Sequence, residues 1–117
     1  MHHENLEVWK LSIELVSEIY KISRKFPREA MFGLSAQMQR AAVSIPSNIA
    51  EGAARQSPKD FLKFVRIAQG SLAELQTQLI IARNIGYDFD SQPIQTMQQS
   101  VGRMLVGLAR NLKSKLP

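Results

Sequence analysis

Apolar residues recur every three or four positions through most of the chain, which is the period of an α-helix with one buried face. Four such stretches are separated by turn residues, and no alternating strand pattern competes with them. We expect helices at about residues 5–26, 32–55, 58–85 and 91–115. The first helix carries two apolar rows: Leu6, Trp9, Ile13, Val16 and Tyr20, and Leu11, Leu15, Ile19, Ile22 and Phe26. The other helices carry one row each: Leu34, Met38, Ala41, Ile45 and Ile49; Phe61, Val65, Ala68, Leu72, Leu75, Leu79 and Ala82; and Ile94, Met97, Val101, Met104, Leu108 and Leu112.

Turn and cap residues lie where these periods stop and start. Pro27 ends the first helix, Ser57-Pro58-Lys59-Asp60 is typical of a capped helix start, and Gly86 is typical of a helix end. Asp90-Ser91-Gln92-Pro93 predicts a second capped start, and Pro46 is expected to bend the second helix. Short connections make successive helices antiparallel. The sequence therefore predicts an all-α fold: one domain, residues 1–117, forming an antiparallel up-and-down four-helix bundle.

Two helices carry more apolar surface than a bundle core needs. In the third helix the apolar residues between Phe61 and Ala68 spread over roughly 220°, about twice the width that faces a core. The first helix, with its two rows, has a similar excess. Extra apolar width is typical of a subunit contact, so we expect a homo-oligomer.

The composition excludes most kinds of catalysis. Among 117 residues there is no cysteine, and the two histidines, His2 and His3, lie at the extreme N-terminus. The serines therefore have no base for a catalytic triad, the adjacent pair His2 and His3 is a poor ligand set for a metal, and the sequence has no Glu-x-x-His motif for a di-iron site. We expect no enzymatic activity, no metal and no cofactor. The sequence shows no signal peptide and no apolar stretch long enough to span a membrane, so we expect a cytoplasmic protein.

Positive charge is concentrated on one face of the third helix. The chain has 15 basic and 10 acidic residues, a net charge of +5, which alone suits a solvated surface as well as a polyanion partner. However, Arg55, Lys59, Lys63 and Arg66 share a narrow face opposite the apolar row. Repeated around an oligomer, they would form a belt suited to nucleic-acid phosphates. The C-terminal segment adds four basic residues: Arg103, Arg110, Lys113 and Lys115. Helix-dipole complementarity accounts for the last two, whereas Arg103 and Arg110 remain open.

A polar stripe follows the second helix. Its members lie within about 100° of one another: Arg40, Ser44, Ser47, Asn48, Glu51 and Arg55. The stripe is either a solvated face with small residues that let helices approach, or a subunit or partner contact that uses serine and asparagine for hydrogen bonds. Arg40 is a further candidate for phosphate contact.

The second and third helices also carry a resemblance to a known family. The string Ser44-Ile45-Pro46-Ser47-Asn48-Ile49-Ala50-Glu51-Gly52 resembles the four-helix-bundle proteins named for 23S ribosomal RNA intervening sequences. The agreement extends over nearly the whole chain, and its other members are Leu6, Val8, Trp9, Lys10, Gly33, Leu34, Ser35, Gln37, Arg40, Ala41, Ala42, Arg55, Phe61, Phe64, Ala68, Gly70, Ser71, Glu74 and Leu75.

The resemblance implies an assembly more than an activity. Relatives form barrel-shaped homopentamers, and some are encoded within insertions in bacterial large-subunit ribosomal RNA genes. A related group, the accessory variability determinant proteins of diversity-generating retroelements, binds nucleic acid and a reverse transcriptase. The resemblance marks five signature or interface positions without giving them a catalytic role: Ser44, Pro46, Asn48, Glu51 and Gly52.

Three functions therefore follow from the sequence. The first is an oligomer that binds RNA or DNA backbones through Arg40, Arg55, Lys59, Lys63 and Arg66. The second is an oligomeric scaffold for a protein partner, docked on the residue 44–55 stripe. The third is a small-molecule site inside the bundle or in the central opening of the oligomer.

Overall fold

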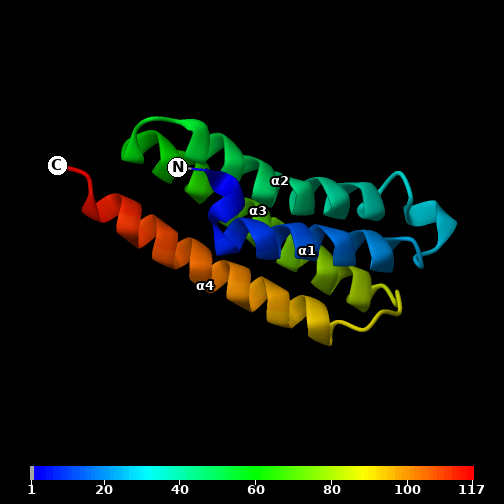
Figure 1. Ribbon diagram of the computed structural model, residues 1–117. Helices are drawn as coiled ribbons and strands as arrows, with labels where there is room; N and C mark the ends of the chain where they lie inside the picture. Colours follow the sequence, from blue (N-terminus) through cyan, green and yellow to red (C-terminus); the bar gives the residue numbers. More distant parts are fainter. Residues whose placement is uncertain (1) are drawn as a thin grey trace.

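A computed structural model describes residues 2–117, which contain four α-helices and no strand. The helices are α1 (Glu7–Ser23), α2 (Leu34–Ala54), α3 (Pro58–Asn84) and α4 (Gln92–Ser114) (Figure 1). Two single-turn 3₁₀ helices, η1 (His3–Asn5) and η2 (Arg28–Ala30), precede α1 and α2. The predicted all-α class and the four helices are confirmed.

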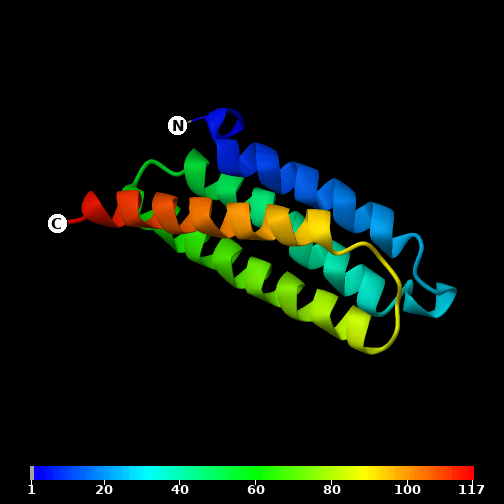
Figure 2. The same cartoon turned by 90° about the horizontal axis from the view of Figure 1, so that it is seen from below.

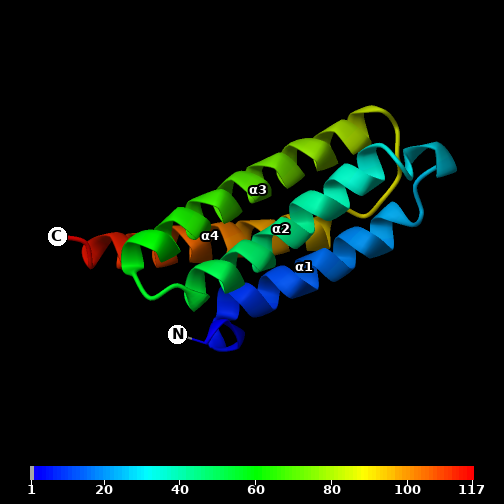
Figure 3. The same ribbon diagram turned by 90° about the horizontal axis from the view of Figure 1, so that it is seen from above.

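Successive helices run antiparallel and close into a bundle. Helix α1 packs against α2 and α4, and α3 packs against the same two helices, so α1 and α3 lie on one diagonal. The bundle extends over 49 × 23 × 21 Å. Both chain ends and the α2–α3 connection lie at one end of it, and the α1–α2 and α3–α4 connections lie at the other (Figures 2 and 3).

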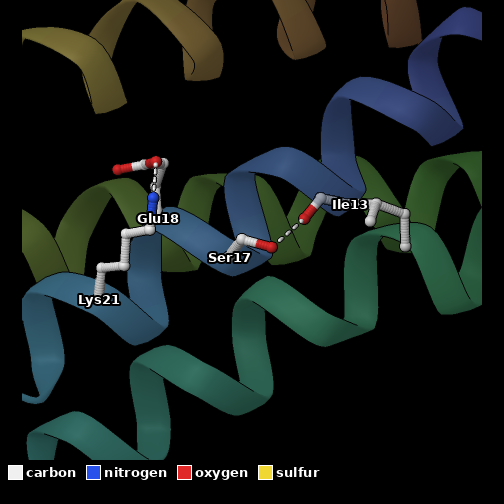
Figure 4. Close-up of polar contacts among 4 residues, drawn as sticks. All are labelled: Ile13, Ser17, Glu18 and Lys21. Atoms are coloured by element: carbon white, nitrogen blue, oxygen red, sulfur yellow. Dashed lines mark hydrogen bonds and ion pairs between the residues drawn. The ribbon is translucent and has the colours of Figure 1, made fainter.

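The predicted core rows are confirmed in α2 and α3. Every member of the α3 row is buried, and so are all members of the α2 row except the half-buried Leu34. In α1 the row through Leu15 and Ile19 enters the core. The other row stays partly outside: Ile13 is 40% exposed and lies on the same stretch of α1 as the Glu18–Lys21 ion pair (Figure 4). Helix α1 therefore keeps apolar surface outside its own bundle.

The row predicted for α4 is partly wrong. Met104 is exposed and Met97 is only half-buried, whereas Gln98, Leu105 and Ala109 are buried. The apolar period did not predict the buried face of α4, because Gln98 is polar but occupies one of its core positions. The Gln98 Nε2 atom has no hydrogen-bond partner within residues 2–117, and it lies beside a cavity of about 460 Å³ along the α3–α4 seam.

The helix ends follow the predicted signals with one difference. The Ser57 hydroxyl accepts a hydrogen bond from the Asp60 backbone N–H at 3.0 Å, and Gly86 has a φ of 94°, which favours glycine. At the start of α4, however, the Ser91 side chain does not cap the helix. The Asp90 carboxylate accepts from the Gln92 N–H at 3.2 Å instead.

The first connection is longer than predicted. Helix α1 ends at Ser23 rather than near residue 26, and α2 begins at Leu34 rather than 32. Pro27 keeps Phe26 out of the helical conformation. The Phe26 ring then packs against Tyr87 and Phe89 with centroid distances of 4.9 and 5.7 Å. This aromatic cluster anchors the α1–α2 connection to the α3–α4 connection.

Candidate functional site

The middle of the signature string forms a hydrogen-bonded link between α2 and α3. The Ser44 and Ser71 hydroxyl oxygens lie 2.8 Å apart, and the Asn48 Nδ2 donates to the Ser44 hydroxyl at 2.9 Å and to its carbonyl at 2.8 Å. Ser71 in turn donates to the Ile67 carbonyl at 3.1 Å. One consistent chain of donors therefore runs from Asn48 through Ser44 and Ser71 to Ile67. These polar groups form their hydrogen bonds within the chain.

The end of the string allows α2 and α3 to approach closely. A Cβ atom on Gly52 would lie 2.8 Å from both the Phe61 Cδ1 and the Phe64 Cβ, which is closer than real contacts. Pro46 is buried within α2, and Glu51 is exposed. The interpretation that small residues in this string let helices approach explains Ser44 and Gly52.

Arg55 is held at the point where α2 ends. Its backbone is extended, and its guanidinium lies 3.2 Å from a Glu51 carboxylate oxygen and 5.0 Å from the centroid of the Phe64 ring. An exposed ion pair of this kind is worth less than about 1 kcal/mol, so it orients the guanidinium without withdrawing it from a ligand.

The basic residues of α3 are free to bind an anion. Lys59 and Lys63 are exposed and form no ion pair with any residue that the structure describes. Arg66 is also exposed, and its Nη1 donates to the Gln69 side chain at 3.1 Å. With Arg55 they form a row at the first turns of α3, which we call the basic end.

Arg40 does not belong to the basic end. It lies on the same helix as Arg55, but about 22 Å away along the helix axis at the usual rise per residue. There it lines a shallow hollow with Tyr20, Val43 and Ser44. The structure thus brings together four of the five predicted phosphate contacts and separates the fifth.

The C-terminus of α4 lies at the same end of the bundle as the basic end. The last turns of α4 lie at the same end of the bundle as the α2–α3 connection in all three views. Arg110, Lys113 and Lys115 are exposed there. The helix-dipole interpretation of Lys113 and Lys115 did not predict this grouping. The antiparallel packing of two consecutive helices nevertheless places the end of α4 beside the start of α3.

The remaining chemistry is sparse. Among residues 2–117, no three histidine or acidic side chains lie together in a way that could hold a metal ion. No helix in the described part of the chain is long and apolar enough to cross a membrane. The basic residues and the exposed apolar side chains are therefore the surface features that point to a function.

Comparison with known proteins places the chain in a family. The family described as 23S rRNA-intervening sequence protein matches residues 4–107. The chain belongs to this family. The match in the 23S rRNA-intervening sequence protein family includes the signature string and the α3 basic residues, but it ends before Arg110, Lys113 and Lys115.

A solved structure shares the fold of this family member. It is a protein of unknown function from the S23 ribosomal protein family of Bacteroides thetaiotaomicron VPI-5482, with a TM-score of 0.81 and 24% sequence identity. The superposition covers 94% of this chain and 99% of that one. At this identity the likeness supports the fold alone. No curated protein matches the chain.

Proposed function

We propose that this protein is a non-enzymatic homo-oligomer that binds the phosphate backbone of RNA or DNA through the basic end. The observation that carries the proposal is the row of Lys59, Lys63 and Arg66, which have no acidic partner in the described chain, beside the oriented guanidinium of Arg55. Each phosphate that a lysine or arginine neutralises releases counterions, so such a row binds nucleic acid without reading its sequence.

Self-association is supported by apolar side chains that the single chain leaves exposed. On α3 and just after it, Ile67, Ile80, Ile81 and Ile85 are all at least 43% exposed, and Ile13 adds a similar site on α1. Burying these side chains in subunit contacts is favourable. A closed ring, which the family resemblance suggests is a pentamer, would repeat the basic end around its axis.

Salt dependence tests nucleic-acid binding. For a mixed panel of RNA and duplex DNA, we expect log affinity to fall linearly with log salt concentration. On duplex DNA, Lys59→Ala, Lys63→Ala and Arg66→Ala should each lower the slope by about 0.9 for every phosphate that the variant no longer neutralises. Fluorescence anisotropy across a salt series measures both quantities. Lys21→Ala is the matched control, because Lys21 pairs with Glu18 on α1 away from the basic end. Absence of binding at low salt contradicts the proposal.

Light scattering tests the assembly. The chain has a mass of 13.2 kDa, and we expect a particle at an integral multiple of that mass, five for a pentamer. The expectation rests on the exposed isoleucines, which a second copy of the chain would bury. A monomer at micromolar concentration would refute the oligomer. The salt series would then test nucleic-acid binding by the single bundle.

The alternative is an oligomeric scaffold for a protein partner. The exposed isoleucines favour it, since aliphatic side chains that are not used between subunits would suit a protein surface. Ser44 and Asn48 support it less, because their side chains are occupied within the chain. An oligomer that binds no nucleic acid at low salt is the result that favours the scaffold.

The relation to the accessory variability determinant proteins belongs to the same proposal. It is supported by the signature string and by the basic ring that a closed oligomer would form. A reverse transcriptase would then be a second partner, and the nucleic-acid experiment tests the property that such a role requires.

A further inference from the structure

A pocket lies at the opposite end of the bundle from the basic end. It occupies about 500 Å³ between the last turn of α1, the 3₁₀ helix η2 and the first turns of α2. The buried Phe26 ring contributes to its wall, and the packing of that ring on Tyr87 and Phe89 fixes the connection around it. The packing of Phe26 therefore fixes one wall of the pocket.

Two arginines give this pocket positive charge. Arg24 and Arg28 both line it, and neither forms an ion pair within residues 2–117. The segment from residue 21 to residue 28 contains four basic residues and no acidic one: Lys21, Arg24, Lys25 and Arg28. A guanidinium presents a planar set of donors that matches the oxygens of a phosphate group.

The pocket lies beside the first turns of α2. As in any α-helix, the first backbone N–H groups of this 21-residue helix have no intrahelical acceptor, and Gly33, which precedes the helix, has no side chain to cap them. Ser35, in the first turn, also lines the pocket. A helix N-terminus with free N–H groups favours an anion.

Ser35 provides independent evidence for a ligand. Its residue is only 5% exposed, yet its hydroxyl has no hydrogen-bond partner in the described chain. The neighbouring polar side chains are satisfied, because Gln39 donates to the Ser23 hydroxyl at 3.0 Å and Ser23 donates to the Tyr20 carbonyl at 3.1 Å. A buried polar atom without a partner requires an explanation, and a bound group that reaches it supplies one.

We propose that this pocket binds a phosphate monoester group. Arg24, Arg28 and Ser35 line the pocket beside the first turns of α2, and their two guanidinium groups and one hydroxyl are donors that suit a group with three terminal oxygens. The site is independent of the basic end, so it stands whether or not the protein binds nucleic acid. The phosphate can come from a small soluble ester or from a lipid headgroup, since Phe32, close by in the chain, is 92% exposed.

Calorimetric titration with inorganic phosphate tests the pocket. We expect saturable binding in the millimolar range, weakened about tenfold by Arg24→Gln and by Arg28→Gln, because each substitution removes one charge-assisted hydrogen-bonding group. Ser35→Ala should weaken binding several-fold while leaving thermal stability no lower, because it removes an unpaired buried hydroxyl. A purely structural Ser35 would leave the phosphate affinity unchanged.

Lys25→Gln is the matched control. It removes the same charge one residue from Arg24, but Lys25 does not line the pocket. Its phosphate affinity should stay within about twofold of the parent value. Equal weakening in Lys25→Gln and Arg24→Gln, or no saturable binding of phosphate, overturns the proposal, because the first result shows only a general charge effect.

Vesicles distinguish the two sources of phosphate. Sedimentation with phosphatidylcholine vesicles containing phosphatidic acid should recover the parent protein, but not Phe32→Ser or Arg24→Gln/Arg28→Gln, if the group is a lipid headgroup. Phosphate binding by calorimetry without vesicle binding assigns the pocket to a soluble ester. Vesicle binding that persists in the double arginine variant, together with no phosphate binding, overturns the pocket.

Discussion

Replacing Gly52 with alanine is expected to lower the free energy of unfolding by about 2–3 kcal/mol, the cost of adding a methyl group to a filled space. The new Cβ would lie 2.8 Å from the Cβ of Phe64, an atom attached directly to the α3 backbone, and 2.8 Å from the Phe61 ring. Relief therefore requires α2 and α3 to move apart, which also strains the Ser44–Ser71 contact. Urea denaturation followed by circular dichroism measures the change, at one protein concentration because assembly contributes to stability.

Gly107→Ala is the control for this substitution. Gly107 lies in the interior of α4, and a Cβ there would meet nothing within 4 Å. Alanine is the better helix former by about 0.8–1 kcal/mol, so this variant should be more stable than the parent. The two alanine substitutions are therefore expected to have opposite signs. A Gly52→Ala protein as stable as the parent would show that the two helices do not need their close approach.

Leu75→Ala is expected to cost about 3–4 kcal/mol, within the range for large-to-small substitutions in protein cores. Leu75 is a fully buried member of the α3 row, and removing its side chain leaves a cavity between helices that cannot close together. The same urea titration gives the value. Glu74→Ala, one position away on the exposed side of α3, should change stability by less than about 0.5 kcal/mol. Equal losses in the two variants would contradict the assigned core face.

The sequence predicts those parts of the fold that depend on local chemistry. The Ser57 cap and the Gly86 helix end depend on neighbouring residues, and both lie where their residue types indicate. The α3 row is equally legible because none of its members is polar. The α4 row is not, since Gln98 is buried and the methionines at 97 and 104 suggest a different face.

The candidate site depends on the pairing of helices, which a single sequence encodes less directly. Residues 44 and 71 are nearly the same number of positions from the turn before Ser57. That they lie side by side along the bundle could therefore have been predicted. Their rotation toward each other could not, because it depends on how α2 and α3 pack. The close approach at Gly52 has the same origin. The proposed phosphate pocket could not be predicted for another reason. The net charge of residues 1–30 is zero, because acidic residues elsewhere in this segment balance the basic residues between Lys21 and Arg28.

The unequal seams of the bundle have a consequence for its motion. The hydroxyl chain and the close fit at Gly52 hold α2 and α3 together, whereas the α3–α4 seam contains a cavity and the Gln98 Nε2 atom, which has no hydrogen-bond partner within residues 2–117. Local opening follows the weakest packing, so α4 should separate first and expose its amide protons to exchange with solvent while the α2–α3 hairpin stays protected. The hairpin would then be the last part of the chain to unfold and the natural nucleus on which the terminal helices assemble.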